Sequence, residues 1–283
     1  MHLPMDILEN QKKQLLNDGY CIVKNFLNEE EIYNLDLSFN EKRKNKNNYI
    51  EHNEEKFWQY LTNDRLLKNL KYSLGDKIYY MHDLSINETR IEDHFRSWHR
   101  DSPCRATGIG PDWDKNFPYN VVSTITYLCS SDESNSHLNV IKGSHKYQYR
   151  FTISNILRFI HRKIHYIKPL RFLSAIIQKI IGTKLTFKSG DCVIFLANLY
   201  HMGSGVTPDD KTRKVILARY GGEGKHSENY INFFLKHRSE NLNRYESFNK
   251  KEQYFNYLKK NGIFFPLPKT KKDIKGVYSN LKK

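Results

Sequence analysis

Short apolar segments divided by turn residues recur along the chain from residue 77 to residue 220. They are rich in β-branched and aromatic residues, which favours strands over helices at this length. The expected strands cover 77–80, 121–128, 138–141, 185–187, 192–196 and 214–220. Many short strands with long connections are typical of a sandwich or a jelly roll, so we expect a mainly β core with helices around it.

Helical patterns precede this core. Gly19 is expected to stop the first helix, and Asn28 and Glu31 have the spacing of a capping box that starts the second. The expected order is a helix at 5–17, a strand at 20–24, a helix to about Phe39, a mobile loop at 40–56 and a helix at 57–71.

An insertion at about 150–184 has the pattern of two helices. Pro169 ends the first and Gly182 the second, and each helix carries an apolar stripe. The stripes comprise Ile153, Ile156, Leu157, Ile160, Ile164 and Ile167, then Leu173, Ile176, Ile177, Ile180 and Ile181. The segment from Arg150 to Lys184 has eight Lys or Arg and no Asp or Glu. Three interpretations stay open: a hairpin packed on the sheet with a solvated basic face, a lid over an anionic substrate, or a helix at a membrane surface.

The length of the chain bounds the number of cores. With 283 residues, of which 39% are hydrophobic, it can bury one large core with appended helices. We therefore expect a single domain over 1–283, with a helical, Lys-rich C-terminal extension at about 225–283.

The charge balance indicates anionic partners. A formal net charge of +15 attracts phosphates, nucleic acids or anionic membrane surfaces. The start of the chain has no apolar run like that of a signal peptide, and no segment approaches the roughly 18 to 20 apolar residues of a membrane span. The four cysteines are scattered, which is typical of reduced thiols. We expect a cytoplasmic location, with peripheral contact at an anionic membrane as an open alternative.

His99, Asp101 and His201 form a candidate catalytic metal site. Two imidazoles and one carboxylate can hold a ferrous ion on one face and leave the opposite face open. His99 and Asp101 lie two positions apart between expected strands, so their side chains point to the same side. His201 comes just after the buried strand expected at 192–196. The set predicts an Fe(II) site that an oxygenase would use.

Arg213, twelve residues after His201, is the expected anchor for the cosubstrate 2-oxoglutarate. This acid chelates iron through its keto acid end, and its far carboxylate needs a fixed cation such as the fork of an arginine. Ser204 is expected to add a hydroxyl, with Thr207 as the alternative. Arg219 is the rival cation, because even spacing places it on the same strand face as Arg213.

Three further residues are candidates for the substrate pocket. Trp98 and Arg105 lie close in sequence to the proximal metal ligands. His145 is equally well interpreted as a structural residue or as one that faces the substrate.

Five stretches of the chain, in order, resemble the phytanoyl-CoA dioxygenase family of iron and 2-oxoglutarate oxygenases. They are 19–27, 99–101, 139–146, 190–195 and 201–213. The resemblance implies a double-stranded β-helix, a cupin-like jelly roll, with flanking helices. It also implies that His99, Asp101 and His201 bind Fe(II) and that Arg213 binds 2-oxoglutarate. Lys142 replaces the usual Pro of the third stretch, and Gly203 stands where some members have Ser.

The expected reaction is hydroxylation of a small anionic substrate with Fe(II), 2-oxoglutarate and dioxygen, which releases succinate and CO2. The candidate substrates are a phosphonate, a sugar or glycan precursor, or a CoA thioester. The carboxylate of Asp101 argues against a halogenase, since related halogenases leave that position open for chloride. Two alternatives remain. A nucleic-acid demethylase is indicated by the net charge and the six-residue spacing of Arg213 and Arg219, although nucleic acid is not the expected partner. The other is a metal-free binding protein on the same barrel.

Overall fold

The computed structural model describes residues 4–45, 54–89, 97–101, 119–205, 212–237 and 251–264. Its strands are β1 (Tyr20–Val23), β2 (Ile78–Thr89), β3 (Val121–Tyr127), β4 (His137–Val140), β5 (Thr183–Leu185), β6 (Cys192–Leu196), β7 (His201–Ser204), β8 (Arg213–Gly221) and β9 (Ile263–Phe264). Its α-helices are α1 (Met5–Asp18), α2 (Glu29–Asn45), α4 (Glu55–Leu61), α5 (Asp64–Leu74), α6 (Ser131–Ser134), α7 (Ile153–Ile164), α8 (Arg171–Ile181), α9 (Lys225–His237) and α11 (Lys251–Lys260). Short 3-10 helices cover Tyr147–Phe151 and Lys168–Leu170.

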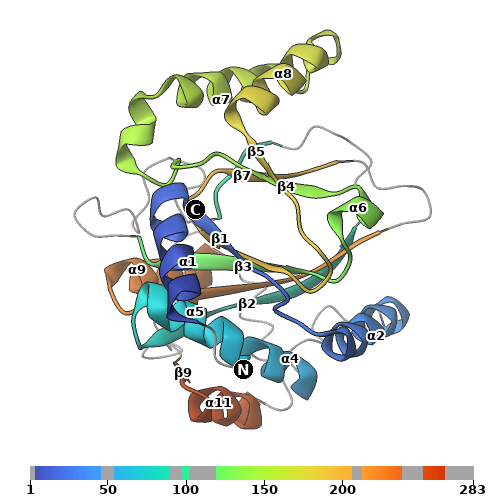
Figure 1. Ribbon diagram of the computed structural model, residues 1–283, viewed down its shortest axis with the longest axis vertical. Coiled ribbons are helices and arrows are strands. Elements are labelled where there is room, and N and C mark those ends of the chain that lie inside the picture. The colour runs from blue at the N-terminus through green and yellow to red at the C-terminus, as the bar shows by residue number, and fades with distance from the viewer. Residues whose placement is uncertain are drawn as a thin grey trace.

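The strands form two sheets that face each other. The larger sheet has the order β1-β6-β3-β8-β2-β9, and the smaller has the order β5-β4-β7. All pairings are antiparallel except that of β2 with β9. In Figure 1 the smaller sheet lies between the larger sheet and the α7–α8 pair, while α1, α2, α4 and α5 lie on the other side of the larger sheet. Two opposed antiparallel sheets agree with the expected double-stranded β-helix.

Alternation along the strands of the larger sheet supplies two cores. On β6, Ile194 belongs to the core between this sheet and the helices, whereas Val193 and Phe195 belong to the core between the two sheets. This is the period of two that a strand buried on both faces produces. The core between the sheets also contains Tyr127 and Leu138, and the candidate metal ligands lie beside it.

Several local predictions are confirmed. The Asn28–Glu31 capping box is present: each residue's backbone N–H donates to the side chain of the other, both at 2.8 Å. Helices are also found at the predicted 5–17 and in the insertion, and the six predicted strands overlap β2 to β6 and β8.

Other local predictions are wrong. The helix expected at 57–71 is two helices, because Asn63 accepts a hydrogen bond from the backbone of Arg65 and caps α5. α2 continues to Asn45 instead of ending near Phe39. Strand β7 was not expected, because its four residues include a glycine and carry little strand signal. Most of the remaining loop expected at 40–56 and the end of the tail lie outside the described residues.

The expectation of a mainly β chain is not confirmed. Among the described residues, helices contain more residues than strands. The jelly-roll sheets are therefore only the centre of a mixed molecule in which helices cover the outer face of the larger sheet. Within the part of the chain that is described, no helix is both long enough and apolar enough to pass through a membrane.

Candidate metal centre

Backbone pairing brings the two candidate ligand segments together across a hundred residues of sequence. His99 and His201 exchange backbone hydrogen bonds of 3.0 and 2.9 Å, as opposed residues of antiparallel strands do. The N–H of Asp101 donates to the carbonyl oxygen of Ala197 at 2.8 Å. Residues 97–101 therefore lie as a short extended segment against the start of β7. This backbone pairing fixes the Cα positions from which the three side chains project.

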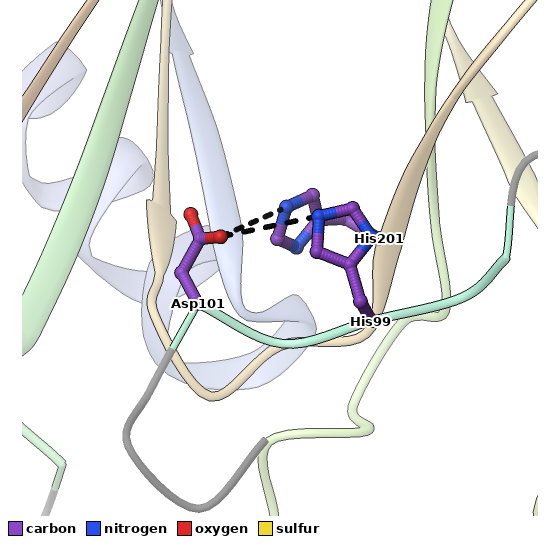
Figure 2. Close-up of side chains that lie close together, drawn as sticks. All are labelled: His99, Asp101 and His201. Carbon is purple, nitrogen blue, oxygen red and sulfur yellow. Dashed lines mark ion pairs between the residues drawn. The ribbon is translucent and has the colours of Figure 1, made fainter. Parts of the chain in front are cut away.

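The side chains of His99, Asp101 and His201 converge on one point (Figure 2). Asp101 Oδ1 lies 3.6 Å from His201 Nε2 and 4.0 Å from His99 Nε2. Two donors bound to one ion at about 2.1 Å are at most about 4.2 Å apart, so both distances suit a shared ion. Among the described residues, this is the group of three or more His, Cys, Asp or Glu side chains found close enough together to bind a metal.

Both imidazoles are oriented by backbone carbonyl groups. The Nδ1 atom of His99 lies 3.1 Å from the carbonyl oxygen of Ser97, and that of His201 lies 3.1 Å from the carbonyl oxygen of Leu199. A carbonyl oxygen only accepts, so each Nδ1 carries the proton. Each Nε2 then carries its lone pair on the side that faces Asp101. Neutral imidazoles fixed in this tautomer are the form that binds metals.

Asp101 is oriented from its other side by Arg219 and Ser123. Asp101 Oδ2 accepts a hydrogen bond of 2.9 Å from the Ser123 hydroxyl and lies 3.1 Å from Arg219 Nη2. Arg219 also donates through Nε to Ser123 and pairs through Nη1 with Asp83. These contacts leave Oδ1 directed towards the histidines. Two neutral imidazoles and one carboxylate, with their donor atoms converging, fit Fe(II).

Arg213 begins β8 and shares a strand face with Val215 and Leu217, which belong to the core between the sheets. Its positive charge acts on Tyr127: burial raises the pKa of the Tyr127 hydroxyl, and Arg213 opposes that rise. The Tyr127 Oη is buried and makes no hydrogen bond to the residues that the structure describes. A buried hydroxyl close to an arginine is suited to a carboxylate, so this end of the space between the sheets fits the far end of 2-oxoglutarate.

The family model for phytanoyl-CoA dioxygenase matches residues 15–215. The chain belongs to the phytanoyl-CoA dioxygenase family. The match covers all three candidate ligands and Arg213. No relative was found among curated proteins.

Solved structures of low sequence identity share the fold. The alpha ketoglutarate dependent epimerase SnoN from nogalamycin biosynthesis is 14% identical, with 77% of this chain and 84% of that chain covered and a TM-score of 0.56. HygX from Streptomyces hygroscopicus with iron bound is 15% identical, with 78% and 88% covered and a TM-score of 0.53. EctD from S. alaskensis with 2-oxoglutarate and 5-hydroxyectoine is 16% identical, with 78% and 79% covered and a TM-score of 0.54. The cofactors expected from the sequence, iron and 2-oxoglutarate, agree with the ligands of these neighbours.

In this family member, Ser204 lies on the outer face of β7. Ser204 and His201 are three residues apart on the strand, so their side chains point to opposite faces. The Ser204 hydroxyl accepts a hydrogen bond from the amide of Asn139. The role predicted for Ser204 in binding the cosubstrate therefore receives no support from its position.

The predicted substrate residues Trp98 and His145 lie away from the convergent ligands. Trp98 is buried in a cluster under α8 with Ile177, and its ring lies 6.3 Å from that of His161. His145 donates through Nε2 to the carbonyl oxygen of Leu16 at 3.0 Å. Burial lowers the pKa of His145 to about 4. These contacts favour structural roles for both residues, and Arg105 lies outside the described residues.

The sequence did not reveal three residues that orient the site: Ser123, Asp83 and Arg219 in its actual role. Arg219 was considered as a rival anchor for 2-oxoglutarate, but here it holds Asp101. The sequence did offer a signal for Ser123. Every residue of β3 is buried, and a serine in a fully buried strand is an unexpected polar residue.

Proposed function

We propose that this protein is an Fe(II)/2-oxoglutarate-dependent dioxygenase that hydroxylates a small anionic substrate and releases succinate and CO2. The observation that carries the proposal is the convergence of two Nε2 atoms and one carboxylate oxygen, each oriented by a second hydrogen bond. Such orientation of ligands before the ion binds is typical of functional metal sites.

The roles of the protein groups follow from the ligand count. His99, Asp101 and His201 would hold iron on one face, which leaves positions for the keto acid end of 2-oxoglutarate and for dioxygen. When bound, this group supplies an oxidant able to remove hydrogen from an unactivated carbon. Arg213 and Tyr127 would bind the far carboxylate of the cosubstrate. The protein needs no general base for this chemistry, so its contribution is positioning and the exclusion of water.

Hydroxylation is the proposed outcome, although the structural neighbours differ in reaction. One is named an epimerase, and another was solved with 5-hydroxyectoine. Both outcomes begin with removal of hydrogen from carbon, and they differ in whether oxygen returns to that carbon. Product mass distinguishes them, because hydroxylation adds one oxygen atom and epimerisation adds none.

An anionic substrate is supported by charge. The chain carries a formal net charge of +15, and its segment 150–184 has eight basic and no acidic residues. A phosphonate, a sugar or glycan precursor, or a CoA thioester each presents the negative groups that such a surface attracts.

The test is succinate production from 2-oxoglutarate with a panel of these substrates, under iron-replete and iron-free conditions. The Asp101→Ala variant should lose iron-dependent, substrate-dependent succinate formation. Asp132→Ala, which changes an exposed acid on α6, is the matched control and should retain it. Full turnover by Asp101→Ala would reject the assignment.

Two alternatives are separated by binding measurements. A nucleic-acid demethylase should shift single-stranded DNA in a gel, and it should lose that binding at high salt. The pairing of Arg219 with Asp101 is compatible with this alternative as well as with the hydroxylase, since in both cases Arg213 would bind the cosubstrate. A metal-free binding protein on the same barrel would retain no stoichiometric iron after anaerobic purification.

A further inference from the structure

The helix pair α7–α8 exposes its apolar residues to solvent. Six of them, distributed along both helices and the turn before them, define what we term the hairpin apolar surface: Phe151, Ile153, Ile156, Phe172, Ile176 and Ile180. Ile153 is 75% exposed, Phe172 68% and Ile180 66%. Single exposed apolar residues are ordinary, but six on one helix pair are the kind of concentration that marks an interaction surface.

The fully buried residues of α7 are polar. Arg158, His161 and His165 are buried, while Ile153, Ile156 and Ile160 on the same helix are exposed. A helix that only packs on a sheet has the opposite distribution. Apolar packing is also present, because Leu157 and Ile164 of α7 and Ile177 and Ile181 of α8 contact the cluster on the barrel. The exposed stripe is therefore not required to attach the hairpin to the barrel.

Basic residues share the hairpin with its apolar surface. Of the eight Lys and Arg in 150–184, Arg158 is buried and the other seven are exposed or partly exposed. The exposed ones are Arg162, Lys163, Lys168, Lys179 and Lys184. No carboxylate in the segment offsets them. Apolar side chains beside cations are the composition of a helix that lies in the interface of an anionic membrane.

The charge distribution argues against a second copy of the chain as the occupant. Two hairpins placed face to face would bring two clusters of basic residues together with no acid in either segment, and this repulsion opposes association. Figure 1 also shows α7 and α8 at the outer edge of the molecule, beyond the smaller sheet. A projecting helix pair can reach a flat surface without obstruction by the barrel.

The hairpin is attached to the segments that carry the metal ligands. The guanidinium of Arg158 lies 4.0 Å from the ring centroid of Tyr200, and that of Arg100 lies 4.1 Å from the same centroid. Tyr200 precedes His201, and Arg100 lies between the other two ligands. The ring of Trp98, adjacent to His99, contacts His161 of α7. Docking of the hairpin would therefore hold the metal centre in a fixed orientation relative to the docked surface.

We propose that the α7–α8 hairpin docks this protein onto an anionic lipid surface, with the hairpin apolar surface entering the interface and the basic residues contacting the headgroups. This part rests on the proposed function: the reaction would then take place at a membrane, and among the anionic substrates proposed above it favours one that carries a lipid chain. The docking itself does not depend on the proposed chemistry, so binding is measured without turnover.

The experiment is flotation of the full chain with vesicles of phosphatidylcholine alone or with about 30% phosphatidylglycerol. The protein should float with the anionic vesicles only, and high salt should weaken this binding because it screens the headgroup contacts. A triple variant should reduce the partition coefficient at least about tenfold, since it removes the apolar contribution. It carries Ile153→Ser, Phe172→Ser and Ile180→Ser.

A matched variant changes exposed apolar residues elsewhere and should bind as the wild type does. It carries Met5→Ser, Tyr33→Ser and Leu37→Ser, at positions 66%, 64% and 41% exposed. Circular dichroism verifies that both variants are folded, and the salt titration of the wild type gives a test that needs no variant. Three results would overturn the proposal: no flotation of the wild type, equal loss in both triple variants, or a wild-type dimer that the hairpin variant dissociates while neither binds vesicles.

Discussion

Arg219 holds Asp101 from the side opposite the histidines, with Nη2 at 3.1 Å from Asp101 Oδ2. The same guanidinium pairs with Asp83 and donates to Ser123. One side chain on β8 thus orients the carboxylate ligand that segment 97–101 supplies. Arg219 is therefore proposed as a positioning residue, which would act on a bound metal through Asp101.

Replacement of Arg219 by Met should lower the affinity for Fe(II) about 10- to 100-fold, because Asp101 loses the group that fixes its orientation. It should also lower the free energy of unfolding of the metal-free protein by about 3 kcal/mol, since two mostly buried carboxylates lose their cation. Anaerobic metal titration and urea unfolding measure these effects. Arg219→Lys retains the positive charge but not the two-pronged guanidinium. Its metal affinity and its free energy of unfolding should lie between those of Arg219→Met and the wild type. Unchanged metal affinity in the Met variant would exclude the positioning role.

Tyr127→Phe should raise the KM for 2-oxoglutarate about tenfold while leaving metal affinity unchanged, because it removes a hydroxyl proposed to bind the cosubstrate carboxylate. Stability should not fall, as that hydroxyl has no hydrogen-bond partner in the described part of the chain. Tyr220→Phe is the control on the other face of the sheet. It loses a hydrogen bond to the carbonyl of Leu61 and should cost about 1 kcal/mol of stability with no change in KM. Equal KM values for wild type and Tyr127→Phe would remove Tyr127 from the cosubstrate site.

Ser144→Ala should loosen the segment that carries His201. The Ser144 hydroxyl accepts a hydrogen bond of 2.9 Å from the backbone N–H of Tyr200, and its carbonyl accepts one from Arg100. Loss of the hydroxyl leaves a partly buried N–H without its acceptor, which costs about 1 kcal/mol. The affinity for Fe(II) and the midpoint temperature of thermal unfolding should both fall. Ser130→Ala, which removes the N-cap of α6, should lower the midpoint temperature of unfolding without changing the affinity for Fe(II).

Acidification should destabilise the metal-free protein partly through His145. Burial lowers its folded pKa from the ordinary 6.5 to about 4, so the unfolded chain binds more protons between these values. The free energy of unfolding therefore falls as the pH drops through this window, by at most about 1.4 kcal/mol per pH unit from this group, and it levels off below about pH 4. Urea unfolding with EDTA at several pH values measures the slope. His145→Gln should reduce the slope, and an identical slope would show that other groups cause it.

Gly205→Ala should be much more harmful than Gly75→Ala. Both glycines have positive φ, of 98° and 102°. A Cβ at Gly205 would overlap the backbone carbonyl of Asn135, whereas a Cβ at Gly75 meets no atom within 4 Å. We expect a loss of about 1 kcal/mol at Gly75, from strain alone, and several kcal/mol at Gly205. Chemical unfolding gives the free energy of unfolding of both variants. Similar losses in the two would show that the backbone at the end of β7 can move to accept the Cβ.

The sequence by itself determined the elements and the ligand types. β-branched runs, the Asn28–Glu31 capping box and the spacing of His99 and Asp101 are local patterns, and local backbone preferences act on them directly. The prediction of one helix at 57–71 was wrong for an equally local reason. Asn63 caps a new helix there, but the apolar pattern runs on through it and so hides the boundary.

Only the tertiary structure decided which distant groups meet. The pairing of His99 with His201 and the attachment of Arg219 to Asp101 depend on strand register, and a shift of one residue would send each side chain to the other face. The same alternation turned Ser204 away from the site. The division of the α7–α8 apolar stripes also required the fold. A stripe indicates that a surface is to be covered, and the tertiary structure shows that the barrel covers Ile177 and Ile181 but leaves the hairpin apolar surface exposed.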